Sequence, residues 1–199
     1  ALMIAVKESE RMRPMIAGLP DFLQPGTSVA NPRMVLITGH RRENFGDGFK
    51  NICQAILTLA GRFPDVHFVY PVHLNPNVRE PVNRYLRAAN QVNIHLIEPL
   101  DYLPFVAMMN RATILLTDSG GVQKEACWLK VPCVTLRDRT EWGETVASGW
   151  NVLAGADKKR IIQAVREFKR PARSSPRFGR SSASAVPASR RIVEILLNS

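Results

Sequence analysis

The stretch LLTDSGGVQKEA, residues 115–126, joins an apolar run to a Ser-Gly-Gly turn and then to residues that favour a helix. Its centre, TDSGG, differs by one residue from the GDSGG run that surrounds a serine-protease nucleophile. A nucleophilic Ser119 would need a β-barrel setting with a His/Asp pair. The other route is a G-x-S-x-G elbow, whose first Gly is absent here. We therefore interpret the stretch as a strand, a tight turn and the start of a helix.

The same order of strand and helix repeats on both sides of this stretch. Short apolar runs predict the strands, and apolar residues at helical spacing predict the helices. The expected strands are 34–38, 66–72, 94–97, 113–117 and 133–136, and the expected helices are 1–17, 49–62, 78–89, 102–110, 122–129, 158–168 and 191–197. Such alternation indicates βαβ units with right-handed crossovers. The predicted fold class is α/β, with a Rossmann-like, doubly wound parallel sheet.

Polar loops follow several of the expected strands. They are GHRRENFGDG (39–48), HLNPN (73–77) and DSGG (118–121). Ligands of open parallel sheets bind at the carboxyl ends of the strands. We therefore expect these loops to lie together and to form the candidate site.

The turn Ser119-Gly120-Gly121 is a candidate phosphate site. The N–H groups of a first helical turn have no partner within the helix, the helix dipole adds positive potential, and glycines let an anion approach the backbone. The alternative is that the turn only caps the helix. Glu125 lies one helical turn after Gly121 on the same face. Its carboxylate suits a ribose diol beside a phosphate, and the alternative is a solvated surface residue.

The loop after the first expected strand brings His40, Arg41 and Arg42 to the same edge of the sheet. Arginine suits bidentate phosphate contact, so two positive loops at one edge indicate a diphosphate ligand. A solvated basic loop paired with Glu43 is the alternative. The absence of Walker A and G-x-G-x-x-G motifs argues against an ordinary NTPase and a dinucleotide enzyme. The spacing of the histidines suits no usual metal site, so no metal is expected.

The net charge of +10 is local rather than spread over the chain. Eleven Lys/Arg and one acid, Glu167, lie between Lys158 and Arg191, and the remainder is neutral. A basic tail with almost no aromatic residues does not predict nucleic-acid binding. No apolar run is long enough to cross a bilayer, and the first residues do not read as a signal peptide. We expect a soluble, cytoplasmic protein without membrane contact.

Five strings follow one another in order between about residues 33 and 165. They are ITGHRRENFGDGF, YPVHLNPNVREPVN, PLDYLPFVAMMN, LLTDSGGVQKEA and TEWGETVASGWNVL. Together they resemble the non-hydrolysing UDP-N-acetylglucosamine 2-epimerases. The resemblance implies one half of a glycosyltransferase-B-type two-domain fold, the C-terminal, UDP-binding half. The expected domains are 1–32, a helix and linker from the N-terminal domain; 33–168, the UDP-binding domain; and 169–199, a basic Ser/Arg/Pro-rich tail with a short terminal helix.

The resemblance also implies roles for individual residues. His40 matches the family's histidine at the UDP diphosphate and is the expected catalytic residue of this half. The implied substrate-binding residues are His40 and the diphosphate turn Ser119, Gly120 and Gly121, with Glu125 at the ribose and Leu100 and Phe105 at the uracil. Arg41, Arg42 and His73 match positions that bind a second, regulatory UDP-GlcNAc in some bacterial members.

The implied reaction interconverts UDP-GlcNAc and UDP-ManNAc by elimination and re-addition of UDP, for bacterial surface polysaccharides. The resemblance implies no metal, no cofactor and a homodimer at full length. In that family the acid–base carboxylates belong to the N-terminal domain, so this chain alone is expected to be inactive. The alternatives are a UDP-sugar-binding module or inactive remnant, and half of a nucleotide-sugar glycosyltransferase. The strings GHRRENFGDG and HLNPNVREPVN speak against the glycosyltransferase.

Overall fold

The computed structural model describes residues 1–27 and 32–171, and its centre is a six-stranded parallel sheet with the order β3-β2-β1-β4-β5-β6. The strands are β1 (Met34–Thr38), β2 (His67–Pro71), β3 (Ile94–Ile97), β4 (Ile114–Thr117), β5 (Cys133–Thr135) and β6 (Asn151–Leu153). The chain moves outward from β1 to β3, then returns to β4 and moves outward in the other direction. The strand order therefore reverses between β1 and β4, where open parallel sheets bind ligands. The predicted doubly wound parallel sheet is confirmed.

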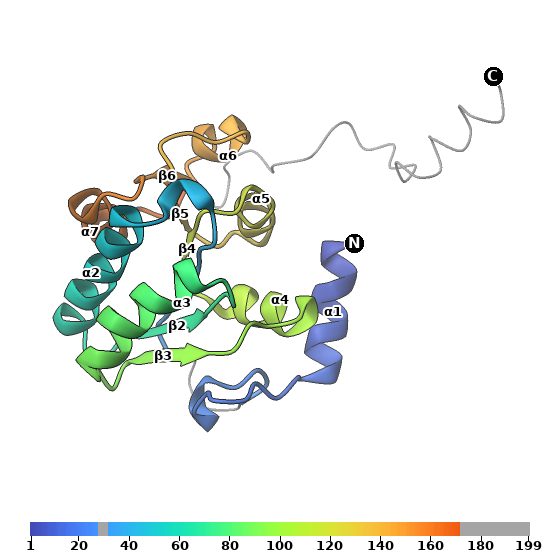
Figure 1. Ribbon diagram of the computed structural model, residues 1–199. Helices are drawn as coiled ribbons and strands as arrows, with labels where there is room; N and C mark the ends of the chain where they lie inside the picture. Colours follow the sequence, from blue (N-terminus) through green and yellow to red (C-terminus); the bar gives the residue numbers. More distant parts are fainter. Residues whose placement is uncertain (28–31, 172–199) are drawn as a thin grey trace, which may run out of the picture.

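Helices cover both faces of this sheet (Figure 1). The helices are α1 (Leu2–Met12), α2 (Asp47–Arg62), α3 (Pro76–Val82), α4 (Tyr102–Arg111), α5 (Gly120–Leu129), α6 (Gly143–Ala147) and α7 (Lys158–Glu167). Val35 and Ile37 of β1 pack in a cluster with α2, α3 and α7, whereas Met34 and Leu36 pack in another with α1, α4 and α5. Burial on both faces explains why the central strands are continuous apolar runs.

The N-terminal segment packs against the sheet's helices rather than continuing as one helix to residue 17. Helix α1 ends at Met12 because Arg13 takes a left-handed conformation, with φ of 45°, and Pro14 follows. The chain then forms a short 3-10 turn, η1 (Asp21–Leu23), whose Leu23 is buried in the same cluster as α1 and α4. The side chain of Gln24 accepts a hydrogen bond from the backbone N–H of Ile16 and donates to its carbonyl, both at 2.8 Å.

Other differences from the predicted elements have local causes. The expected helix 78–89 is split into α3 and a π-helical turn, η3 (Asn83–Arg87), and Pro81 lies within α3, where it cannot donate a backbone hydrogen bond. The short elements α6 and β6 were not predicted, because neither has enough residues to show a period. The predicted helix 191–197 and residues 172–199 of the tail lie outside the described residues. Within the described residues, no helix is both long and apolar enough to span a membrane.

Two histidines form a pair on the α1/α4 side of the sheet. Nδ1 of His67 in β2 lies 3.1 Å from Nε2 of His95 in β3, and the ring of Phe22 packs on His67 with centroids 4.9 Å apart. Burial lowers the pKa of His67. Burial, together with the charge that His67 would carry, lowers the pKa of His95 from 6.5 to about 4.

The histidine pair should make the protein less stable at acid pH. Between about pH 6.5 and 4 the unfolded chain binds protons that the folded pair resists, so stability is present above this range and is lost as the pH falls through it. Urea-unfolding midpoints at pH values on either side of this range measure the loss. His95→Gln should make the loss smaller, since glutamine does not titrate, whereas His73→Gln, at an exposed histidine, should not. An equal loss in His95→Gln and the unsubstituted chain would contradict this role.

Candidate functional site

Five predicted site residues line one cavity of about 250 Å³ at the carboxyl edge of the sheet. They are His40, His73, Leu100, Phe105 and Ser119, and the other lining residues are Thr38, Pro71, Pro99 and Val122. These residues lie at the ends of β1 and β2, in the segments that follow β1, β2, β3 and β4, and in α4 and α5. Residues that are distant in the sequence meet here because parallel strands present all their carboxyl ends at one edge.

Asp118, which was not predicted as a site residue, connects the two central loops of this edge. It follows β4, its side chain is fully buried, and it accepts hydrogen bonds from the loop after β1. The backbone N–H groups of His40 and Arg41 donate to Oδ2 at 2.9 and 2.8 Å, and the side-chain amide of Asn44 donates to it at 3.2 Å. Nδ1 of His40 lies 3.7 Å from Oδ1. Asp118 thus sets the position of His40 beside the turn Ser119–Gly121.

The wall of the cavity differs from one side to the other. On the β2 side, the rings of His40 and His73 are stacked, with centroids 5.4 Å apart and planes 20° apart. On the α4 side, Leu100 and Phe105 are half-buried against the core cluster of α1 and α4. A slot with an apolar wall and a few polar groups is typical of sites for small organic ligands, including planar bases.

The first turn of α5 has the backbone N–H groups that an anion site requires. Ser119 is the N-cap residue, but its side chain makes no capping hydrogen bond. Its own backbone N–H donates to Oγ1 of Thr117 at 3.0 Å. A Cβ added at Gly121 would meet nothing within 4 Å, so an approaching group has free access there. Gly120 is different: a Cβ there would lie 3.3 Å from both Oε2 of Glu141 and Nε1 of Trp142.

Glu125 lies on α5 and is not among the residues that line the cavity. Its Oε1 accepts a hydrogen bond of 2.7 Å from the hydroxyl of Tyr102, at the start of α4. This bond to the carboxylate, together with burial, raises the pKa of Tyr102 to about 12. Tyr102 was not predicted as a site residue, although it lies within the string PLDYLPFVAMMN. The carboxylate of Glu125 on α5 therefore points toward the start of α4.

The three residues expected at an effector site have different surroundings. His73 stacks on His40 on the β2 side. The charge of Arg41 instead lowers the pKa of Glu141, which lies in the segment after β5, although the backbone and Arg137 are the larger causes. Arg42 begins a 3-10 turn, η2 (Arg42–Asn44), and is exposed. Within the described residues, no cluster of three or more His, Cys, Asp or Glu side chains could hold a metal ion.

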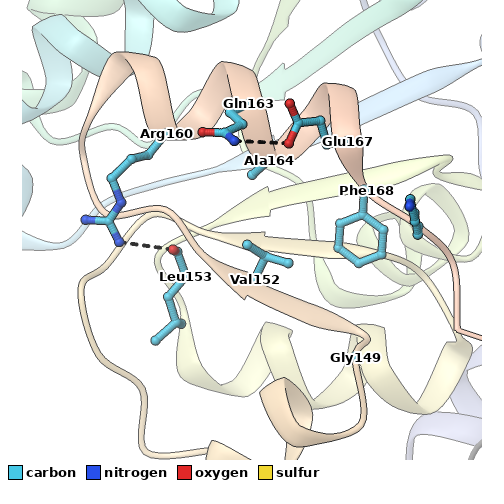
Figure 2. A pocket seen from close by; sticks show the side chains of 9 residues that line it. Gly149, Val152, Leu153, Arg160, Gln163, Ala164, Glu167 and Phe168 are labelled. Atoms are coloured by element: carbon cyan, nitrogen blue, oxygen red, sulfur yellow. Dashed lines mark hydrogen bonds between the residues drawn. The ribbon is translucent and has the colours of Figure 1, made fainter.

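A second hollow of about 300 Å³ lies between β6 and α7 and contains none of the predicted site residues (Figure 2). Several of its polar groups already bond to one another. Arg160 donates to the carbonyl of Leu153 at 3.1 Å, and Gln163 donates to Glu167 at 3.0 Å. We therefore assign the candidate site to the cavity beside His40.

Known proteins are similar to this chain in both sequence and fold. A family model described as UDP-N-acetylglucosamine 2-epimerase matches residues 8–197. The UDP-N-acetylglucosamine 2-epimerase of Escherichia coli K12 is 43% identical over an alignment of 200 positions, which covers 97% of this chain and 50% of the relative. That of Yersinia pestis is 54% identical over 135 residues, 68% of this chain and 35% of the relative. The chain spans about half the length of the curated relatives it matches.

Solved structures give the same result. The UDP-GlcNAc 2-epimerase of Neisseria meningitidis bound to UDP-GlcNAc superposes with a TM-score of 0.75 at 37% identity, over 100% of this chain and 53% of that one. The Methanocaldococcus jannaschii UDP-GlcNAc 2-epimerase in complex with UDP-GlcNAc and UDP gives 0.74 at 32% identity, over 100% and 52%. The C-terminal domain of a group 1 glycosyl transferase from Francisella tularensis gives 0.54 at 16% identity, which shows a shared fold alone.

Proposed function

This chain belongs to the UDP-N-acetylglucosamine 2-epimerase family, and on that premise we propose that the edge between β1 and β4 binds the UDP part of UDP-GlcNAc. One observation gives the main support for this proposal. Residues from the segments after four strands converge on one cavity, beside the start of α5, where the N-cap residue makes no side-chain capping hydrogen bond. In this proposal the uracil lies against Leu100 and Phe105. The diphosphate lies at the first turn of α5 and at His40.

The diphosphate assignment follows from the groups that are free to donate. The N–H groups at the start of α5 and the helix dipole attract an anion, and Gly121 leaves room for one. His40 lines the same cavity as Ser119, and Asp118 holds its backbone there. Donors that face a departing diphosphate stabilise the negative charge that develops on it, which makes UDP a better leaving group.

The ribose assignment rests on Glu125. A carboxylate beside a diphosphate would repel it, but it accepts hydrogen bonds from the two ribose hydroxyls. The Tyr102 hydroxyl occupies one oxygen, Oε1. A ribose hydroxyl therefore bonds to the other oxygen, or replaces the tyrosine hydroxyl.

For the full-length protein we propose interconversion of UDP-GlcNAc and UDP-ManNAc by elimination and re-addition of UDP. The resemblance assigns the proton-transfer carboxylates to the N-terminal half of such enzymes. The chain covers half of its relatives' length, so we propose that these 199 residues bind UDP without turnover, as a binding module. The bacterial polysaccharide pathway and the homodimer stay predictions of the resemblance, and the cytoplasmic location stays a prediction of the sequence pattern.

Calorimetric titration of UDP into the 199-residue chain tests the assignment. His40→Ala and Glu125→Ala should each weaken binding by about 10-fold, the size expected for a lost hydrogen bond to a charged group. Glu144→Ala, at an exposed carboxylate of α6, should change it less than about 2-fold. Two results would count against the proposal: a folded chain that does not bind UDP, or site variants that bind UDP as the unsubstituted chain does.

A further inference from the structure

The segment that follows β5 lies against the first turn of α5. Oε2 of Glu141 and Nε1 of Trp142 are each 3.3 Å from the position that a Cβ of Gly120 would occupy. Gly120 is the first residue of α5. A carboxylate oxygen thus lies next to the helix end at which the diphosphate is proposed to bind.

The same carboxylate is bound to a cation. Nη1 of Arg137 donates to Oε2 of Glu141 at 3.0 Å, and Nε of Arg137 pairs with Glu43 in the loop after β1. The Arg137 side chain is only 10% exposed, whereas Glu141 is 59% exposed. The pKa of Glu141 is lowered by its own backbone N–H and then by Arg137 and Arg41. Glu141 therefore carries its negative charge at neutral pH, and Arg137 has a carboxylate on either side.

Packing against α5 holds this segment in place. The ammonium of Lys124 lies 4.2 Å from the centroid of the Trp142 ring, a cation–π contact. The backbone N–H of Trp142 donates to Oγ1 of Thr140 at 3.1 Å, and that hydroxyl donates to Oε1 of the buried Gln123 at 2.6 Å. Lys124 and Gln123 both belong to α5. The position of Glu141 at Gly120 is thus set by contacts with the helix itself.

We propose that Glu141 competes with the ligand's diphosphate for the first turn of α5 and for Arg137. In this proposal Arg137 binds the phosphate: its ion pair with Glu141 breaks when the diphosphate binds, and its ion pair with Glu43 remains. A diphosphate has more negative charge than one carboxylate and forms bidentate contacts with a guanidinium, so the exchange favours the ligand. The exposed Glu141 side chain can turn into solvent. This inference rests on the proposed binding of UDP at the same turn.

Removing the charge of Glu141 should therefore tighten binding. With Glu141→Gln we expect UDP and inorganic pyrophosphate to bind about 5- to 10-fold more tightly at low salt, since one competing charge near the site is lost. Binding of uridine, which has no phosphate, should not change. Glu144→Gln removes the same charge a few residues further along and should alter each affinity less than about 2-fold. Isothermal titration calorimetry on the 199-residue chain measures all three ligands.

Arg137 is tested in the Glu141→Gln background. Arg137→Gln should abolish the gain in affinity, and Arg137→Lys should keep part of it, because lysine retains the charge without the planar fork. Circular dichroism and a thermal scan establish that each variant folds. If the Glu141→Gln chain keeps its higher UDP affinity after Arg137 is replaced by Gln, Arg137 does not bind the phosphate.

The possible failures are distinguishable. If the unsubstituted chain binds UDP and Glu141→Gln binds it equally or more weakly, the competition is overturned and the proposed function stands. Weaker binding would mean that Glu141 contacts the ligand. If neither the chain nor any folded variant binds UDP, this inference and the proposed function are both overturned.

Discussion

Replacing Asp118 by Ala is expected to lower the free energy of unfolding by about 3–5 kcal/mol and to abolish UDP binding. Asp118 is fully buried, and its carboxylate accepts hydrogen bonds from two backbone N–H groups and from the amide of Asn44. Alanine would remove the acceptor of the two backbone N–H groups and would leave the Asn44 amide with the carbonyl of Leu136, at 3.1 Å. The loop that carries His40 would then lose its attachment to β4.

Urea unfolding and a UDP titration at one pH measure both effects. Asp138→Ala is the matched control, because Asp138 is 81% exposed and pairs with Arg160 on the surface. The free energy of unfolding of the control should lie within about 0.5 kcal/mol of that of the unsubstituted chain. Asp118→Asn should lose an amount of unfolding free energy between those of Asp118→Ala and the control, since the amide oxygen still accepts hydrogen bonds but the charge is gone. A loss below about 1 kcal/mol for Asp118→Ala would show that the carboxylate does not hold the two loops together.

Replacing Gly121 by Asp is expected to weaken UDP binding by about 100-fold while leaving stability unchanged or slightly raised. A Cβ at Gly121 meets no atom within 4 Å, and the residue lies in the first turn of α5. A carboxylate there suits the helix dipole and so does not disturb the fold. It would, however, occupy the position proposed for the diphosphate and repel the negative charge of the diphosphate.

Gly143→Asp provides the control for this substitution. Gly143 also begins a helix, α6, and a Cβ there also meets nothing within 4 Å. The control adds the same side chain at the start of another helix, so it should leave UDP affinity within about 2-fold. Equal affinity in Gly121→Asp and Gly143→Asp, with both proteins folded, would place the diphosphate elsewhere.

Much of the fold was predictable because its signals are local. The run 34–38 is wholly apolar apart from its last residue, and the observed β1 has the same bounds. The helix predicted over 102–110 is observed as Tyr102–Arg111. The prediction failed where an element has only a few residues, as in β6, or where Pro81 lies within a helical pattern and a π-helical turn follows.

The candidate site was predictable in its residue types and only partly in its geometry. The rule that ligands meet the carboxyl ends of parallel strands correctly grouped His40, His73 and Ser119 around one cavity. It did not reveal Asp118, although a charged residue directly after a buried strand has to find hydrogen-bond partners. The roles assigned to these residues stay predictions until UDP binding is measured.

By itself, the sequence determined the α/β class, the order of the elements and the glycine turn at the start of α5, because these depend on periodicity and turn chemistry among near neighbours. Only the tertiary structure decided which side chains meet across that edge. Asp118 contacts the backbone of His40, 78 residues away, and Arg137 joins Glu43 to Glu141. These contacts exist because β4 pairs with β1 on one side and with β5 on the other. Strand neighbours are set by how the whole sheet packs, which no local stretch of sequence encodes.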